Sequence, residues 1–214
     1  MHERNNMENK KKYITNGWLA VAIVTLILVI DQIIKIEVKT NMTLGEAIRV
    51  TDWFYIEFIE NNGMAYGMTF FNKLVLSLFR TFAIGAISWY IWRAVKSGLY
   101  SRGYVVCLAM ILAGAAGNLI DCLFYGLVFD ASTPFSVADF VPFGTGYSTF
   151  LHGKVVDMFY FPLIDTTWPD WLPVIGGRPF RFFEPVFNFA DSCVTVGAAY
   201  LILFQSKFFM TETK

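Results

Sequence analysis

Four long apolar runs are the feature that most constrains this chain. They lie at about residues 14–34, 74–95, 104–125 and 186–209. Each has close to the roughly 20 residues that an α-helix needs to cross the hydrocarbon core of a bilayer, and 56% of the 214 residues are hydrophobic. A soluble domain of this size cannot bury that much apolar side chain. We therefore expect a mainly α-helical integral membrane protein with a bundle of four transmembrane helices.

Basic residues near the ends of these runs indicate the orientation, because cytoplasmic segments of membrane proteins carry an excess of Lys and Arg. Lys10–Lys12 precede the first run. Arg93 lies at the end of the second run and is followed by Lys96 and Arg102, and Lys207 lies at the end of the fourth run and is followed by Lys214. No small-residue cleavage pattern follows the first run, which we therefore expect to be retained as an anchor. We expect both termini on the cytoplasmic side and the two long connections on the outer side.

Two segments outside the spans are expected to form the outer part. Residues 36–73 have a β-type composition, in which residues 53–59 read WFYIEFI and predict a strand, and Asn61–Gly63 predict a turn. Residues 126–185 hold most of the prolines and predict a long loop with short elements. Neither a repeat nor a linker divides the chain, so we expect one membrane-embedded domain over residues 1–214.

Charge and cysteine content exclude several classes of function. The 17 basic and 17 acidic residues give a net charge of zero, which argues against a nucleic-acid-binding surface. The three cysteines form no CxxC pair and the sequence has two histidines, so we expect no disulfide framework, no metal site and no cofactor. The sequence also lacks the HExxH and GxSxG motifs. Carboxyl groups remain as the candidate reactive groups.

Polar side chains recur inside or at the edges of the spans, where they are costly and therefore indicate function. They form three pairs at helical spacing, namely Asp31 with Lys35, Asn118 with Asp121, and Asn188 with Asp191. Glycine and alanine precede the second pair, which allows close helix packing. The alternative interpretations are a local ion pair that snorkels to the interface for the first pair, and interhelical hydrogen bonds without a catalytic role for the other two.

A further carboxyl group, Asp157, lies in the long outer connection. It stands within VVDMF, and its apolar neighbours would press this segment against the membrane or the bundle. We therefore expect the Asp157 carboxyl group to be partly desolvated, although an aspartate in a long loop is more often solvated. The segment Glu60–Gly67, which follows the predicted strand, has an ordinary hairpin turn as its alternative.

Carboxylates at one end of a helix bundle suit two kinds of chemistry. A pair of carboxyl groups can share one proton, activate water and polarise a carbonyl group, and a partly dry site would raise the pKa of one of them. The same residues could instead pass ions or protons, and a transporter is the competing class. A third interpretation is an assembly factor whose polar residues only lock helices together. Polar groups near one face of the membrane favour hydrolysis.

Five short motifs occur in an order that is typical of one family. They are DQIIK at 31–35, NNGMAYG at 61–67, GNLID at 117–121, VVDMF at 155–159 and FNFADSCVTVG at 187–197. In these motifs the chain resembles the lipoprotein signal peptidases, also called signal peptidase II, which are aspartic proteases of the bacterial inner membrane. The resemblance covers all four expected spans.

The resemblance implies an enzyme that removes the signal peptide of prolipoproteins by cutting before a diacylglyceryl-modified cysteine. It implies Asp157 and Asp191 as the catalytic pair. It implies supporting or substrate-contacting roles for Asp31, Lys35, Asn61, Gly63, Asn118, Asp121 and Asn188. It also implies that residues 40–70 form a small periplasmic β-sheet cradle on the membrane surface. We expect a monomer whose partners are the modified prolipoprotein and membrane lipid.

Two features depart from the family pattern. The family usually has Arg directly after the aspartate of GNLID, where this chain has Cys122, so Arg80 or Lys154 would have to supply a cationic contact. The separations from Asp121 to Asp157 and from Asp157 to Asp191 are also longer than is usual in the family. We expect the extra loops to form a lid or to contact a partner.

Overall fold

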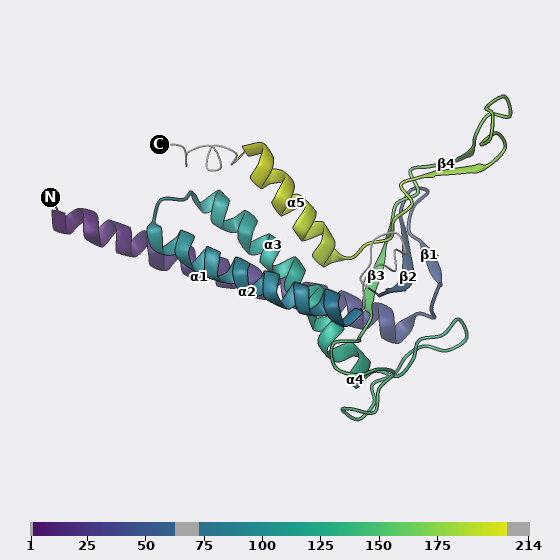
Figure 1. Ribbon diagram of the computed structural model, residues 1–214, viewed down its shortest axis with the longest axis horizontal. Helices are drawn as coiled ribbons and strands as arrows, with labels where there is room; N and C mark the ends of the chain where they lie inside the picture. The colour runs from purple at the N-terminus through teal and green to yellow at the C-terminus, as the bar shows by residue number, and fades with distance from the viewer. Residues whose placement is uncertain (1, 63–72, 205–214) are drawn as a thin grey trace.

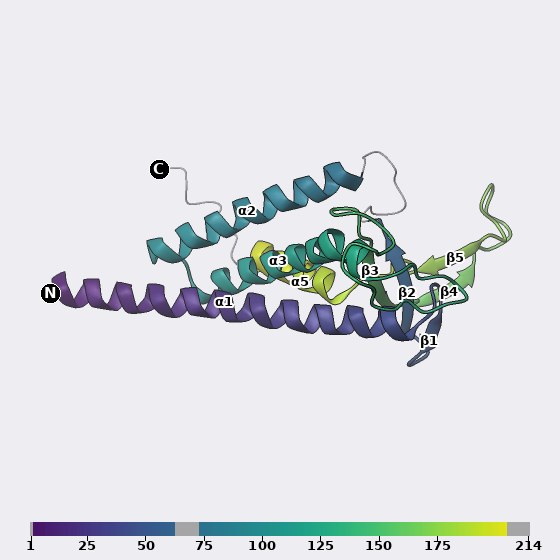
Figure 2. The same cartoon turned by 90° about the horizontal axis from the view of Figure 1, so that it is seen from below.

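The computed structural model describes residues 2–62 and 73–204, with side chains described from residue 14. Its helical elements are α1 (His2–Asn41), α2 (Lys73–Ser97), α3 (Arg102–Ile120), the π-helical turn η2 (Asp121–Tyr125), α4 (Gly126–Val128) and α5 (Phe189–Phe204). They run side by side as an elongated bundle (Figure 1). The N-terminal end of α1 and the C-terminal end of α5 lie at one end of the bundle, and the β-strands lie at the other, which we call the sheet end (Figures 1 and 2).

Within the described residues, three helical segments are long and apolar enough to cross a membrane. They are Ile14–Asn41, Lys73–Ser97 and Arg102–Val128, with mean hydropathies of 2.4, 1.6 and 2.0. Helix α5 is apolar but shorter, with 16 residues up to Phe204. The fourth expected span, 186–209, extends beyond the described residues, so the count of four spans stays a prediction. A mainly helical protein with long apolar helices is confirmed.

Helix α1 is longer than the first apolar run predicts. It continues past residue 34 to Asn41 and includes the first residues of the segment expected to be β-type, 36–73, so that expectation is wrong for residues 36–41. The reason is that Lys35 and Lys39, one turn apart, both meet buried acidic side chains. With their charges paired, the helix can continue beyond its apolar part.

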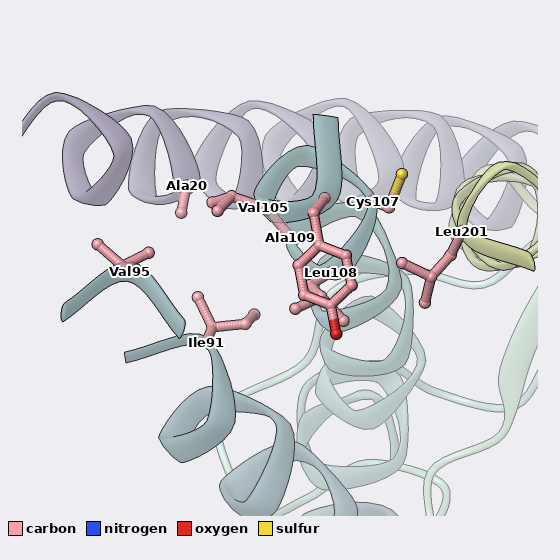
Figure 3. Close-up of a cluster of buried hydrophobic side chains, with 9 residues drawn as sticks. Ala20, Ile91, Val95, Val105, Cys107, Leu108, Ala109 and Leu201 are labelled. Atoms are coloured by element: carbon pink, nitrogen blue, oxygen red, sulfur yellow. The ribbon is translucent and has the colours of Figure 1, made fainter. Parts of the chain in front are cut away.

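Helix α3 is the centre of the bundle and contacts α1, α2 and α5. Figure 3 shows one cluster of buried side chains between these helices, with Ala20 on α1, Ile91 on α2 and Val105 on α3. Towards the sheet end the helices approach more closely, and a Cβ added at Gly114 would lie 2.3 Å from the Ala190 carbonyl oxygen. The small residues before Asn118 therefore allow close packing, as the sequence predicts.

The sheet end is formed by a small antiparallel sheet whose strands lie in the order β1–β2–β3. Its strands are β1 (Ala47–Arg49), β2 (Tyr55–Asn61) and β3 (Val155–Tyr160). The predicted strand over 53–59 is found as β2, shifted by two residues, and the expected small sheet is confirmed. The structure adds β3 from the connection 126–185, so both long segments build the sheet. Ile59 pairs with Asp157, and Asn61 pairs with Val155.

The rest of the connection 126–185 forms two ordered parts. Residues 129–153 fold against the sheet end, where Phe129 packs with Phe58 and Met158 in a second buried cluster. Strands β4 (Ile164–Thr167) and β5 (Pro179–Phe182) form a separate hairpin that projects away from the helices (Figure 1).

Candidate active site

The polar residues singled out in the sequence meet at the sheet end. Those that the structure describes come from five elements and the start of α5, and they are Asp31, Lys35, Asn61, Asn118, Asp121, Asp157, Asn188 and Asp191. All are buried except Asn61 and Asp191, which are half-buried. Gly63 lies outside the described residues, so its predicted role is not addressed by the structure.

Lys35 is at the centre of the buried ionic part of this cluster. Its Nζ lies 2.9 Å from Asp31 Oδ2 and 2.8 Å from Asp121 Oδ2, and it donates a hydrogen bond of 2.9 Å to Asn118 Oδ1. The predicted i,i+4 pair with Asp31 is therefore present. The Lys35 side chain is 0% exposed, so the alternative of an ion pair that snorkels to the interface is wrong. One ammonium group thus joins α1 to the end of α3.

The two carboxylates around Lys35 also connect other elements. Asp31 Oδ1 accepts a hydrogen bond of 2.9 Å from the backbone N–H of Ala190, in the first turn of α5, where negative charge is favourable. Asp121 Oδ2 accepts a hydrogen bond of 3.3 Å from the N–H of Val156 on β3. Gln32 Nε2 donates to Asp121 Oδ1 at 2.9 Å. These carboxylates therefore orient α5 and the sheet relative to α1 and α3.

Helix α5 begins with a reciprocal cap formed by Asn188 and Asp191. Asn188 Oδ1 accepts from the Asp191 N–H at 2.9 Å, and Asp191 Oδ2 accepts from the Asn188 N–H at 3.3 Å. This arrangement follows the capping box, in which the cap residue and the third helical residue exchange hydrogen bonds. The i,i+3 spacing in the sequence therefore holds the Asp191 carboxylate beside the helix N-terminus.

The same asparagine reaches the second candidate carboxyl group. Asn188 Nδ2 donates to Asp157 Oδ1 at 2.7 Å and to Asn118 Oδ1 at 3.0 Å. Asn118 Nδ2 in turn donates to Asp191 Oδ1 at 2.8 Å. Asp157 on the sheet and Asp191 on α5 are therefore linked through two shared amides.

Asp157 is 2% exposed, so the alternative of a solvated loop aspartate is wrong. Its Oδ2 also accepts from Asn61 Nδ2 at 3.1 Å. Burial and then the negative charge of Asp191 raise the pKa of Asp157 from 3.8 to about 7, against the opposing effects of Asn61, Asn188 and Lys35. The expected raised pKa of one carboxyl group is thus found at Asp157. Two linked carboxyl groups, one of which holds its proton near neutral pH, can perform general acid and base catalysis.

Cys122 stands where the family usually has an arginine, and it is buried beside a different arginine, Arg80. Arg80 on α2 donates from Nη1 to Cys122 Sγ at 3.4 Å. Lys154, the other candidate, pairs with Glu60 at 2.8 Å. Of the two suggested cations, Arg80 is therefore the one that contacts Cys122.

Some residues of this region were not singled out by sequence reasoning. Gln32 is one, although an amide within an apolar helix was a usable signal. Lys39 is another, and it follows Lys35 by four residues on the same face of α1. Among residues 2–62 and 73–204, no group of three or more His, Cys, Asp and Glu side chains is placed to hold a metal ion.

Solved structures with the same fold are known. A chain described as "Bacterial membrane enzyme structure by the in meso method at 2.3 A resolution" matches with a TM-score of 0.59 and 21% identity, covering 92% of this chain and 93% of that chain. A second, described in the same words at 1.9 A resolution, has a TM-score of 0.58 and 22% identity. At these identities the likeness concerns the fold.

Sequence relatives carry the comparison further. A "Lipoprotein signal peptidase" from Porphyromonas gingivalis is 48% identical over 187 residues, which are 87% of this chain and 82% of the relative. One from Amoebophilus asiaticus is 35% identical over 192 residues, or 87% of this chain and 77% of the relative. The family model described as "Signal peptidase (SPase) II" matches residues 23–207. The chain therefore belongs to the signal peptidase II family.

Proposed function

We propose that this protein is an aspartic endopeptidase that removes the signal peptide of prolipoproteins by cutting before the diacylglyceryl-modified cysteine. The observation that carries this proposal is the amide-linked pair Asp157 and Asp191, drawn from the sheet and from α5. Membership of the family, and relatives named lipoprotein signal peptidase, support the same activity. The enzyme is thus a protease that uses neither a serine nor a cysteine nucleophile.

In the proposed reaction the two carboxyl groups have different roles. Asp157, whose pKa of about 7 keeps it largely protonated below neutral pH, donates its proton to the scissile carbonyl oxygen. The Asp191 carboxylate takes a proton from water, and the resulting hydroxide adds to the carbonyl carbon. When the tetrahedral intermediate collapses, the C–N bond breaks, Asp191 gives its proton to the amine, and Asp157 recovers its own. The products are the signal peptide and the lipoprotein with a free cysteine amine.

The supporting residues have roles that follow from their contacts. Asn118 and Asn188 orient the two carboxyl groups through their amides. Asp31, Lys35 and Asp121 join the helices behind them. Asn61 fixes Asp157 from β2, and Gly63 belongs to the segment that meets the substrate.

The proposal includes a place in the cell. The protein crosses the bacterial inner membrane four times with both termini in the cytoplasm, and it acts as a monomer. The acyl chains of the modified cysteine remain in the outer leaflet, so the scissile bond lies near that surface. The sheet end, where Asn118 and Asn188 link Asp157 to Asp191, would then face the periplasm, and the loops within 126–185 would close over the substrate or contact a partner.

Substitution of each carboxyl group tests the function. We expect Asp157→Asn and Asp191→Asn each to abolish cleavage of a diacylglyceryl-modified precursor in detergent, because each reaction step above needs one of the two groups. Glu37→Gln, at an exposed residue of α1, is the control and should cleave like the parent protein. Parent-like turnover in either active-site variant would disprove the assignment. Ion flux in proteoliposomes without cleavage would instead support the transporter.

A further inference from the structure

A second buried ionic cluster lies at the sheet end, one helical turn beyond Lys35. Lys39 Nζ is 2.6 Å from Glu60 Oε1 and donates to Ser132 Oγ at 2.8 Å. Glu60 Oε2 is 2.8 Å from Lys154 Nζ. The Lys39 side chain is 0% exposed. Together these contacts join α1, β2, the loop after α4 and the residue before β3.

Aromatic rings surround the buried ammonium group of Lys39. Its Nζ lies 5.9 Å, 5.3 Å and 5.0 Å from the ring centres of Phe58, Phe129 and Tyr147. These rings attract a cation, but replacing a buried ion pair with apolar residues is often neutral or stabilising. Stability alone therefore does not explain this cluster, whereas a fixed geometry between elements does.

The cluster is connected to Asp157 over a very short path. Glu60 precedes Asn61, whose amide donates to Asp157, and Glu60 pairs with Val156 across the sheet. Lys154 directly precedes β3, which carries Asp157. On the helix side, Asp31, Lys35 and Lys39 follow one another at intervals of four residues on α1. Lys35 holds the helices together, and Lys39 holds the sheet to the same helix.

We infer that Lys39 and Glu60 are positioning residues that fix the sheet carrying Asp157 relative to the helices carrying Asp191. The inference rests on the proposed function, because it concerns the geometry of that pair of carboxyl groups. The two groups belong to different parts of the fold, so their separation depends on how the sheet is attached. A misplacement of about 1 Å at a reacting group can reduce a rate about 100-fold.

The primary test compares Lys39→Met with the parent protein. Methionine has a similar length and suits the aromatic surroundings, and Glu60 keeps Lys154 as its partner. We expect kcat for a modified precursor to fall about 10- to 100-fold while KM changes by less than about twofold, because the reacting groups shift but the substrate surface remains. Lys96→Met, at an exposed residue in the last turn of α2, is the matched control and should leave kcat unchanged.

The pH dependence of kcat separates positioning from general loss of structure. The groups around Asp157 are Asp191, Lys35, Asn61 and Asn188, and the repulsion from Asp191 weakens if the sheet moves away. We therefore expect the two apparent pKa values of kcat to lie closer together in Lys39→Met. A purely structural role would lower the melting temperature without changing their spacing.

Glu60→Gln provides a second variant if Lys39→Met does not fold. It removes the charge but keeps an oxygen that can accept from Ser132. The inference would be overturned if the folded variants had a parent-like kcat and an unchanged spacing of the two apparent pKa values. It would also be overturned if kcat fell only in proportion to the fraction of protein that is folded. Asp157→Asn, assayed in parallel, separates the two proposals: if it retains activity, the proposed function itself fails.

Discussion

The buried acids at the sheet end fall into two groups according to their partners. Asp31 and Asp121 each contact the ammonium group of Lys35, which compensates their negative charge. The described hydrogen bonds of Asp157 come from the neutral amides of Asn61 and Asn188, with Lys35 acting only through space. Burial and the negative charge of Asp191 outweigh these donors and Lys35, so the pKa of Asp157 is raised.

This raised pKa predicts how stability depends on pH. The unfolded chain releases the Asp157 proton near pH 3.8, but the folded protein holds it up to about pH 7. Between these two pH values the folded state binds more protons than the unfolded state. The free energy of unfolding that Asp157 contributes therefore falls as the pH rises through this interval, and it stays constant above about pH 7. The difference in melting temperature, parent protein minus Asp157→Asn, should therefore decrease from pH 4 to pH 7. One pKa unit corresponds to about 1.36 kcal/mol, so the pH-dependent part of this difference in stability is at most a few kcal/mol.

Thermal unfolding in detergent, followed by tryptophan fluorescence at several pH values, measures this difference. Thr166→Ala, which changes an exposed and non-titrating residue on β4, should differ from the parent protein by the same amount at every pH. If the difference for Asp157→Asn is also independent of pH, Asp157 is not the group that retains its proton.

At the scale of elements, the start of α5 combines a structural and a chemical task in one residue. Asn188 caps the helix with its side-chain oxygen and contacts Asp157 and Asn118 with its side-chain nitrogen. Serine caps a helix about as well as asparagine, whereas alanine does not, and neither supplies the amide. Replacing Asn188 by serine or by alanine therefore separates capping of the helix from the amide contact with Asp157.

We expect Asn188→Ser and Asn188→Ala to lose activity to the same extent, about 10- to 100-fold, because leaving the buried Asp157 oxygen without this hydrogen bond costs about 1–3 kcal/mol. The serine variant should be more stable than the alanine variant by about 1 kcal/mol. Precursor cleavage and thermal unfolding measure the two effects. Parent-like activity in Asn188→Ser would show that the amide is not required, and equal stability of the variants would show that the cap is not.

Elements governed by local pattern could be predicted from the sequence. The apolar runs indicate the helices, and the i,i+3 and i,i+4 spacings bring Asn188 to Asp191 and Asp31 to Lys35, because these partners are neighbours on one helix. The aromatic and β-branched composition of residues 53–59 likewise indicates β2.

Elements that depend on distant partners could not be predicted in this way. The strand β3 forms because residues 155–160 pair with β2, which lies far away in the chain, and its mostly buried side chains give no alternating pattern. The extension of α1 to Asn41 depends on Lys39 meeting Glu60, again across the fold. The pairing of Asp157 with Asp191 had to come from the family resemblance, since no spacing connects them.

At the scale of the whole molecule, the site lies at one end and the basic connections at the other. The sheet, Asp157 and the start of α5 are at the sheet end, whereas the connection between α2 and α3 is at the opposite end (Figure 1). That connection follows Arg93 and Lys96 and precedes Arg102, which favours a cytoplasmic position. The hydrolysis proposed here therefore requires the sheet end to face outward.

Cysteine labelling tests this orientation, because the three native cysteines are buried and should react little. We expect Thr166→Cys, on the exposed hairpin, to react with a membrane-impermeant maleimide in intact spheroplasts. Leu99→Cys, at a residue that is 78% exposed between α2 and α3, should react only after the membrane is permeabilised. The unsubstituted protein gives the background. The reverse pattern would place Asp157 and Asp191 on the cytoplasmic side, away from the acyl chains of an outer-leaflet substrate, and would contradict the proposed site of cleavage.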